Sequence, residues 1–371
     1  MRTSFTVQKE SGSKILWKSL SLLLRWVTSH FLNFSFYPFP MIALNFIIIN
    51  WNTRQLLLDC LSSIYTTATD LKYQIYVVDN GSQDESVKAV HDQFPRVCVI
   101  ENQENRGFAA AVNQALKNTI ETYTYSVLLN TDTLLQRDAI SAMYSFMEQH
   151  KDAGIAGAQL QKPDGTRQHS YDNYPTLATE LFNKSLLRWL FPKKYPSKKT
   201  QATQPVEVES VIGACMMIRN KAIEDVGKLD EDYFFFLEET DWCYRMQKAG
   251  WKVYHIPEAR VIHLGGQSKK RAPWQSQVEY CRSLYLFFRK NRSAFSYLML
   301  RIFYLVKISL NLAVNAVGNV LMFFQNKKLR YRLSIYYKLF LWHLFLCPDG
   351  MGLKPPNSNN KRQEKIHHSL R

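Results

Sequence analysis

The chain has 371 residues, of which 46% are hydrophobic and 13% aromatic. These values exclude a chain that is disordered throughout, and they favour one large folded domain with appendages. The six cysteines include no C-x-x-C pair and no close spacing, which argues against a disulfide scaffold and a zinc site and fits a reducing, cytoplasmic setting.

The net charge of +16 is concentrated at the two ends of the sequence. Residues 269–371 hold 19 Lys and Arg against 3 Asp and Glu, residues 1–40 hold 5 against 1, and residues 41–268 hold 23 against 27. The basic residues are interleaved with Leu, Phe, Tyr and Trp, which matches anionic lipid headgroups better than nucleic acid. No recognised nucleic-acid-binding motif occurs, so we expect a membrane surface as a partner and no nucleic acid.

Residues 1–40 form an N-terminal basic and apolar extension. Charged residues interrupt its apolar stretch at 15–36, and no small-residue cleavage site follows, so a secretory signal is not expected. Two interpretations stay open. The extension is either a helix on the membrane surface or upstream translation, with Met41 as the true start.

From Met41 onward, strand patterns alternate with helix patterns, which predicts an α/β domain with a mostly parallel sheet. Strands are predicted at 42–49, 74–79 and 125–130, and apolar residues recur at helical spacing over 108–120. Each predicted strand is followed by polar residues. Because ligands of open α/β sheets collect at the carboxyl ends of strands, we expect one site assembled from three places.

Several residues near these strand ends could carry chemistry. Asp132 follows the third strand and is a candidate metal ligand, and Asp79 with Asn80 could bind a nucleobase or ribose. Arg106 and Gly107 open a helix whose N-terminus could face phosphate. The alternatives are a helix cap or turn at Asp132, an ordinary turn at Asp79 and a surface charge at Arg106.

Residues 184–206 are rich in Lys and Pro and predict an exposed, mobile loop. A plain connector is the simpler interpretation, and a lid or an acceptor-binding loop is the alternative.

Three acids follow an aromatic run at 233–236, namely Glu238, Glu239 and Asp241. They begin a predicted helix that ends at Gly250, where acids also favour the helix dipole. A partly buried carboxylate suits a general base, because desolvation raises its pKa towards working pH. His263 ends an apolar segment and is either a structural histidine or a further metal ligand.

The stretch 302–324 is long enough to cross a bilayer. Lys307, Asn311, Asn315 and Asn319 nevertheless recur every four residues and mark one polar stripe. The stripe favours a helix that lies at the interface or packs on a partner, with a membrane span and a helix packed on the body of the protein as the alternatives. Residues 336–346 repeat the aromatic composition.

The order of these motifs resembles that of family 2 inverting glycosyltransferases, and within them the rhamnosyltransferase-like branch. The motifs are IIINWN at 47–52, VVDNGS at 77–82, NRGFA at 105–109, LLNTD at 128–132, GAC at 213–215, EETDWCYR at 238–245 and His263. The resemblance covers about 41–268. It implies a catalytic domain there with the GT-A (nucleotide-diphospho-sugar transferase) fold and a mostly parallel central sheet. The tail 269–371 would supply basic, aromatic, membrane-associated helices.

The resemblance also implies roles for individual residues. Asp132 would be the last carboxylate of the D-x-D element and would contact a divalent metal, Mg²⁺ or Mn²⁺, with His263 completing the metal site. Glu239 would be the catalytic base, although the family has Asp there, which makes Asp241 a rival. Residues expected to bind the nucleotide sugar are Asn52, Asp79, Asn80, Arg106, Gly107, Asn113 and Asn130. Asn130 departs from the family's first D-x-D acid.

The expected function is inverting transfer of a sugar from a nucleoside-diphosphate donor to a hydroxyl of a cell-surface or lipid-linked glycan. The branch favours rhamnose from a dTDP donor, and the tails favour the cytoplasmic face of the plasma (inner) membrane, with the protein held there peripherally or integrally. Two alternatives stay open, a non-catalytic membrane-bound nucleotide-sugar-binding protein and a sugar nucleotidyltransferase. The latter usually carries a Gly-rich, Lys-containing loop after the first strand, whereas this chain has Asn50-Trp51-Asn52-Thr53.

Overall fold

The computed structural model describes residues 44–69, 71–182, 184–192, 202–265, 272–348 and 351–353. They belong to one compact unit, Ile42–Arg371. The predicted extension 1–40 and the proposed start at Met41 lie outside the described residues, as does the predicted boundary near 268.

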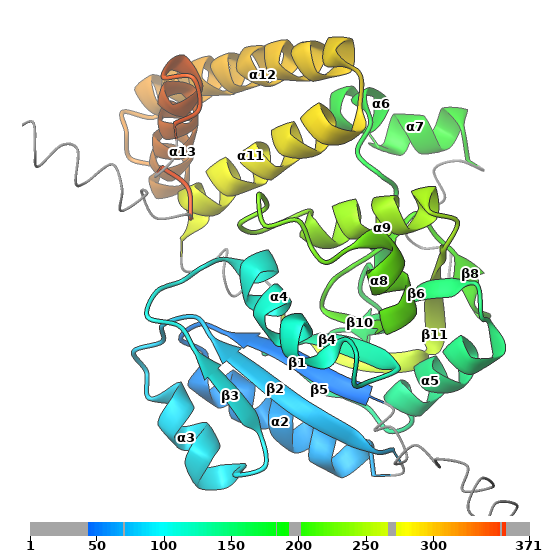
Figure 1. Cartoon of the computed structure of the whole chain (residues 1–371). Coiled ribbons are helices and arrows are strands. Elements are labelled where there is room, and N and C mark those ends of the chain that lie inside the picture. Colours follow the sequence, from blue (N-terminus) through cyan, green and yellow to red (C-terminus); the bar gives the residue numbers. More distant parts are fainter. Residues whose placement is uncertain are drawn as a thin grey trace, which may run out of the picture. The chain divides into compact units, whose positions relative to one another are not determined.

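A nine-stranded sheet forms the centre of the described part, in the order β3-β2-β1-β4-β10-β6-β11-β5, with β8 on β11 (Figure 1). The strands β3, β2, β1 and β4 are parallel to one another, and β11 is parallel to β6. β10 runs antiparallel between β4 and β6. The expected α/β fold with a mostly parallel sheet is therefore confirmed. The strands are β1 (Leu44–Asn50), β2 (Tyr73–Asp79), β3 (Cys98–Glu101), β4 (Tyr125–Asn130), β5 (Thr133–Leu135), β6 (Ala153–Gln161), β8 (Val206–Glu207), β10 (Cys215–Arg219) and β11 (Lys252–His263); β7 (Tyr171–Asp172) and β9 (Ser210–Val211) form a second small sheet.

Helices cover both faces of the sheet, which explains the continuous apolar run of β1. Phe46 and Ile48 face the core that contains α2 (Arg54–Thr67), while Ile47 faces the core that contains α4 (Phe108–Thr119). The three predicted strands and the helix after 107 are confirmed, with ends shifted by a residue or two. The other covering helices are α3 (Ser86–Gln93) and α5 (Ala139–Gln149) on the α2 side, and α8 (Asn220–Val226) and α9 (Glu238–Lys248) on the α4 side.

The helix α11 (Pro273–Asn291) packs into the core on the α4 side. Its Val278 and Phe287 are fully buried in the same cluster as Trp242 of α9. Lys290 Nζ pairs with Asp232 Oδ2 at 2.6 Å. The predicted division near 268 stays a prediction. The helix α11, which follows position 268, is held by the core on the α4 side of the sheet.

The predicted loop at 184–206 is wrong in its first part, which forms α7 (Lys184–Leu190) after a short α6 (Leu177–Leu181). The prolines that suggested a loop begin at Pro192, after α7 has ended. Leu187 lies on the inner side of α7 and is buried, which anchors this helix.

The predicted stretch at 302–324 belongs to α12 (Ala294–Leu321), which packs along α13 (Lys327–Leu344). Asn315 and Asn319 of the polar stripe are buried, and their Nδ2 atoms donate to the backbone carbonyls of Asn311 and Asn315 at 2.8 and 2.7 Å. These contacts lie within the chain and support the alternative of a helix packed on the body of the protein.

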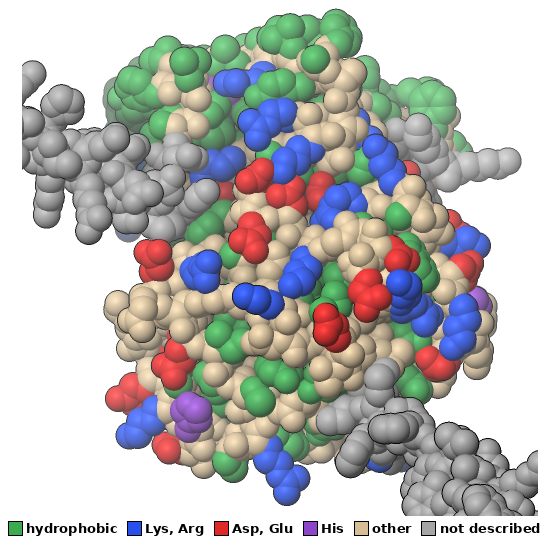
Figure 2. All heavy atoms as spheres, viewed as in Figure 1, with side chains coloured by type: hydrophobic (Ala, Val, Ile, Leu, Met, Phe, Trp, Pro, Cys, Tyr) green, Lys and Arg blue, Asp and Glu red, His purple; other side chains and the backbone are tan. Residues whose placement is uncertain are grey.

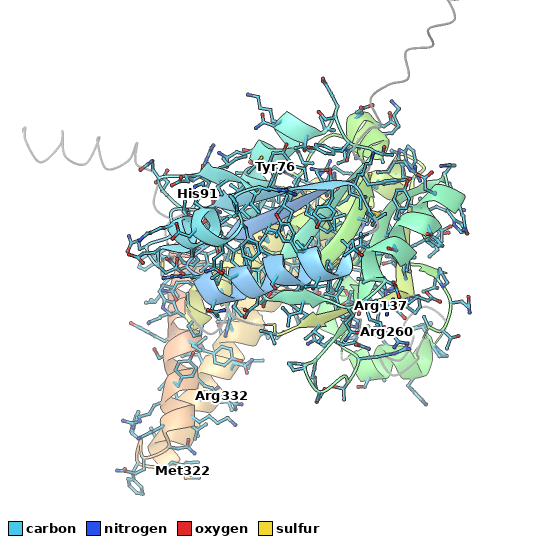
Figure 3. All side chains as sticks on the ribbon, turned by 90° about the horizontal axis from the view of Figure 1, so that it is seen from below. Tyr76, His91, Arg137, Arg260, Met322 and Arg332 are labelled. Atoms are coloured by element: carbon cyan, nitrogen blue, oxygen red, sulfur yellow. The ribbon has the colours of Figure 1, made fainter. Side chains whose placement is uncertain are left out.

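The outer side of α12 is apolar and exposed. Figure 2 shows hydrophobic side chains gathered over α12 and α13, and Figure 3 shows Met322 and Arg332 towards the end of this helix pair. Among the described helices, α12 is the one long and apolar enough to cross a membrane. Its exposed apolar residues are Phe295, Leu298, Ile302, Leu305, Val306, Leu310, Val314, Val317, Val320 and Leu321.

Candidate active site

Asp79 is fixed at the carboxyl end of β2, beside the end of β1. It pairs in register with Asn50, whose Nδ2 donates to Asp79 Oδ2 at 2.7 Å. The backbone N–H of Ser82 donates to the other carboxylate oxygen at 2.7 Å. Asn52 lies one turn away with a left-handed φ of 53°, and its Oδ1 accepts from the Gln83 N–H at 2.7 Å. Both predicted residues thus belong to one ordered edge.

A hydroxyl connects this edge with the end of β4. The Thr53 hydroxyl lies 2.7 Å from Asn50 Oδ1 and 3.0 Å from the Thr131 hydroxyl. Thr131 stands between Asn130 and Asp132, so the ends of the first and third predicted strands meet at one place.

Asn80 and Gly107 join the end of β2 to the start of α4. Asn80 Nδ2 donates to the Gly107 carbonyl at 3.1 Å. Gly107 has a φ of 87°, and a Cβ there would stand 2.6 Å from the Phe234 carbonyl oxygen. That same carbonyl accepts from the Phe108 N–H at 2.8 Å. The glycine therefore lets the aromatic segment approach α4, while Arg106 beside it is exposed.

Asn113 is used inside the fold. Its Nδ2 donates to the Leu229 carbonyl at 2.8 Å and to Glu231 Oε1 at 2.9 Å, and its Oδ1 accepts from the Leu229 N–H at 3.1 Å. The amide is fully engaged in holding this segment against α4. Nucleotide binding by Asn113 stays a prediction, and no geometry here adds to it.

Asp132 and His263, far apart in the sequence, meet where β5 pairs with β11. Asp132 Oδ1 lies 3.5 Å from His263 Nε2, and the two side chains are 12% and 15% exposed. Gln168 Oε1 lies 3.1 Å from His263 Nδ1, and Gln168 Nε2 donates to the His263 carbonyl. With Nδ1–H donating to Gln168, Nε2 keeps its lone pair towards Asp132.

These two side chains fit a divalent metal. A carboxylate oxygen and an imidazole nitrogen are ligands that Mn²⁺ accepts, and Mg²⁺ sites commonly use one or two carboxylates together with substrate phosphates. Within the described residues, no group of three His, Cys, Asp or Glu side chains could hold a metal. A metal held by these two side chains keeps positions open for substrate and water oxygens. Asn130 lies at the same edge, and its backbone N–H donates a hydrogen bond to the Ala214 carbonyl at 2.9 Å.

The acids of α9 follow a strained turn. Phe236 and Leu237 have φ angles of 74° and 65°, a left-handed conformation that costs a bulky residue about 1–3 kcal/mol. Ser283 of α11 donates its hydroxyl to the Phe235 carbonyl at 2.9 Å. Together with the Phe108 contact to Phe234, this bond holds the turn, which sets where the acids point.

Glu239 is a partly buried carboxylate beside Gly213, in the segment that joins β9 to β10. A Cβ at Gly213 would stand 3.3 Å from Glu239 Cγ, and Gly213 precedes Ala214, which binds Asn130. Burial raises the pKa of Glu239, although backbone hydrogen bonds from Gly213 and Thr240 oppose that effect. A carboxylate with a raised pKa beside the third strand end suits a general base.

Asp241 occupies a different environment. It is buried and accepts hydrogen bonds from Arg245 Nε at 2.8 Å, Asn291 Nδ2 at 2.9 Å and the Tyr233 hydroxyl at 3.3 Å. These bonds engage the carboxylate in joining α9 to α11. The geometry therefore favours Glu239 over Asp241 as the base.

Sequence reasoning missed Gln168, Gly213 and Ser283. Gln168 lies in a connecting segment without a motif, and Ser283 lies beyond the region of resemblance. Gly213 lies within a matched motif, but its closeness to Glu239 depends on how α9 packs on β9, just before Gly213. A local signal existed for Gly213 alone.

Several known proteins resemble this chain in sequence. A family model described as "Glycosyl transferase family 2" matches residues 45–227. The chain is 26% identical over 239 residues to the N-acetylglucosaminyl-diphospho-decaprenol L-rhamnosyltransferase of Mycobacterium tuberculosis, covering 61% of this chain and 78% of that protein. It is 26% identical over 249 residues to the low-salt glycan biosynthesis hexosyltransferase Agl10 of Haloferax volcanii, covering 66% and 73%.

Two solved structures are loosely similar. The mannosyltransferase PcManGT from Pyrobaculum calidifontis, in complex with GDP-Man and Mn²⁺, matches at a TM-score of 0.49 and 17% identity, over 88% of this chain and 95% of that one. GalNAc-T7 with UDP, GalNAc and Mn²⁺ matches at 0.47 and 14%, over 61% and 44%.

The chain is a hexosyl-type glycosyltransferase. Its residues 45–227 match glycosyl transferase family 2, as the resemblance implied, and the chain is similar to a member of the rhamnosyltransferase-like branch. The family match does not support the nucleotidyltransferase and non-catalytic alternatives.

Proposed function

We propose that this chain transfers a sugar, with inversion, from a metal-bound nucleoside-diphosphate sugar to a hydroxyl of a cell-surface or lipid-linked glycan. The supporting observation is the convergence of Asp79, the Asp132–His263 pair and Glu239 on the ends of neighbouring strands. Nucleotide binding, charge neutralisation and proton abstraction are the three tasks that such a transfer needs.

Each group has a task in this proposal. Asp79 accepts hydrogen bonds from the nucleobase or ribose, and Arg106 faces the diphosphate. Asp132 and His263 would hold Mg²⁺ or Mn²⁺, which when bound would neutralise charge on the departing nucleoside diphosphate. Gln168 keeps His263 in the tautomer that leaves Nε2 free.

Glu239 takes the proton from the acceptor hydroxyl. The acceptor oxygen attacks the anomeric carbon from the side opposite the diphosphate, the new C–O bond forms as the bond to the diphosphate oxygen breaks, and the configuration inverts. The diphosphate leaves with the bonding electron pair, and the proton stays on Glu239 until solvent removes it. Burial of Glu239 raises its pKa and so makes it a stronger base than an exposed carboxylate.

The names of the relatives support a choice of sugar and acceptor. The mycobacterial relative is named as an L-rhamnosyltransferase that acts on a diphospho-decaprenol-linked N-acetylglucosamine. This supports rhamnose as the sugar and a lipid-linked glycan as the acceptor, although the haloarchaeal relative is named only as a hexosyltransferase.

A lipid-linked acceptor requires contact with a membrane, which α12 and α13 are suited to provide. The outer side of α12 is apolar, whereas its Asn315 and Asn319 are turned inward, an arrangement opposite to that of a helix in water. The first turns of α13 carry exposed Lys327, Lys328 and Arg330, which complement anionic headgroups. We infer that the pair binds the cytoplasmic face of the plasma (inner) membrane.

Two isosteric variants test the chemistry. Glu239→Gln keeps the side chain's shape and loses its basicity, so we expect turnover to fall by about 10²–10⁴-fold while donor affinity stays unchanged. Asp241→Asn is the matched control and should retain turnover within about tenfold, because the Asp241 carboxylate is engaged in hydrogen bonds that join α9 to α11. Turnover would be measured with the nucleotide-sugar class that binds. An active Glu239→Gln with an inactive Asp241→Asn would reverse the assignment of the base.

A further inference from the structure

The helix α7 and Phe191, which directly follows it, present apolar side chains that the proposed chemistry does not use. Trp189 is 78% exposed, Phe191 56% and Leu190 49%, while Leu187 on the other side is buried. The apolar side chains of this seven-residue helix point mostly outward, whereas a surface helix normally turns them inward. Exposed apolar groups that gather in one place mark an interaction surface.

The segment that precedes this surface is fixed to α12. α6, which immediately precedes α7, packs against α12, and the buried Tyr304 of α12 donates its hydroxyl to Glu180 of α6 at 2.9 Å. Figure 1 shows α6 and α7 at the same end of the compact unit as α12, and Figure 2 shows hydrophobic side chains over both places. An element of the catalytic domain is thus fixed beside the helix proposed to contact the membrane.

Charge indicates which partner covers α7. Four lysines follow Phe191 in the sequence, at 193, 194, 198 and 199, and exposed Lys and Arg open α13. Aromatic side chains with nearby cations are the composition of segments that lie in the interface of an anionic bilayer, where Trp is strongly favoured. A buried protein interface, by contrast, is depleted in lysine.

We propose that α7 is a second membrane contact, in which Trp189 and Phe191 insert between the headgroups of an anionic bilayer. The inference rests on the membrane contact of α12 in the proposed function. Two separated contacts fix the angle of the catalytic domain to the membrane, which one flexible contact does not. The carboxyl ends of the strands would therefore meet a lipid-linked acceptor in a constant orientation.

The first measurement reads Trp189 alone in the full-length protein. The chain has eight tryptophans, so the fluorescence of the native protein minus that of Trp189→Phe isolates this indole. We expect the difference spectrum to shift to the blue on binding to phosphatidylcholine vesicles that contain phosphatidylglycerol. Bromine atoms on the acyl chains should quench it, whereas neutral vesicles should have a weaker effect.

A charge variant provides the second measurement. Trp189→Glu should weaken partition into the anionic vesicles by about tenfold, the effect of losing about 1.4 kcal/mol of binding free energy. Val206→Glu is the matched control, because Val206 is an exposed apolar side chain on β8, and it should leave partition unchanged. Neither substitution should alter donor affinity, which also shows that the variants fold.

Three results would overturn the proposal. A vesicle-bound protein whose Trp189 signal is unquenched would leave α12 as a contact without α7. Protection of Trp189 from acrylamide before vesicles are added would mean that the chain itself or a second copy covers α7, and a dimer that Trp189→Glu dissociates would identify the second copy. Loss of donor binding in the native protein, by contrast, would count against the proposed function and leave the α7 result intact.

Discussion

Gln168 makes two contacts with His263 and orients its side chain. His263 itself is identified from the sequence. Its Oε1 meets His263 Nδ1 at 3.1 Å, and its Nε2 binds the carbonyl of the same residue. The first contact selects the tautomer and the second fixes the backbone. One side chain outside any motif therefore decides that the nitrogen facing Asp132 carries no proton. Pattern reasoning identified both proposed metal ligands but could not identify their support, which depends on strand pairing.

His255 is a residue whose protonation should set part of the pH dependence of stability. It is fully buried in β11 with its ring 4.9 Å from that of Tyr171. Burial, with a smaller effect from Arg167, lowers its pKa to about 4. The unfolded imidazole binds a proton near pH 6.5, so the folded state loses stability as pH falls from about 6.5 towards 4.

The variant His255→Phe should remove this loss. Over that pH window the histidine contributes on the order of 3 kcal/mol to the change in unfolding free energy. Urea denaturation at several pH values should give a smaller fall for His255→Phe than for the native protein. Glu238 and Glu239, whose pKa values are raised by burial, bias stability in the opposite direction in both proteins and cancel in the comparison. Equal slopes would show that His255 does not titrate differently on folding.

At the scale of elements, the segment from Phe234 to Leu237 links three helices. α4 binds the Phe234 carbonyl, α11 binds the Phe235 carbonyl, and the left-handed pair that follows begins α9. The strain of that pair persists because neighbours on both sides hold it. The position of Glu239 therefore depends on contacts with α4 and α11 as well as on α9 itself.

Gly107→Ala tests this dependence. The new Cβ would combine a left-handed backbone with a close approach to the Phe234 carbonyl, so we expect a loss of about 3 kcal/mol in unfolding free energy together with reduced turnover. Gly165→Ala is the matched control, because Gly165 has a φ of 78° with open space around it. It should lose only about 1 kcal/mol and keep full turnover. Similar effects of both variants on turnover would contradict the role of the Phe234 contact.

The elements differ in how far the sequence predicts them. β1, β2 and β4 are predictable because parallel strands covered on both faces are continuous apolar runs. The antiparallel insertion of β10 between β4 and β6 depends on chain crossover, and α7 was mistaken for a loop because of prolines that lie after it. The packing of α11 on the acids of α9 is a tertiary contact without a local signal.

At the scale of the whole molecule, the proposed function assigns acceptor delivery to the α12–α13 pair and donor chemistry to the sheet. Lysine at both Leu310 and Val317, two exposed residues of α12, should lower turnover with a vesicle-embedded lipid-linked acceptor by about tenfold, because charge is costly in the acyl region. Donor hydrolysis and transfer to a short soluble acceptor should be unchanged, as should all activities of Val206→Lys. A uniform loss across the acceptors would indicate damage to the fold and contradict this separation.

The most direct test of the account is calorimetric titration of UDP-, dTDP- and GDP-sugars into the full-length protein, with Mn²⁺ or Mg²⁺ and then with chelator. We predict that one nucleotide class binds with metal, and that chelator or Asp132→Ala weakens this binding by about 10- to 100-fold. Asp92→Ala, which removes an exposed carboxylate on α3, should have no effect. Donor binding that is indifferent to chelator and to Asp132→Ala, or no binding of any donor, would contradict a metal-assisted sugar transfer at this edge of the sheet.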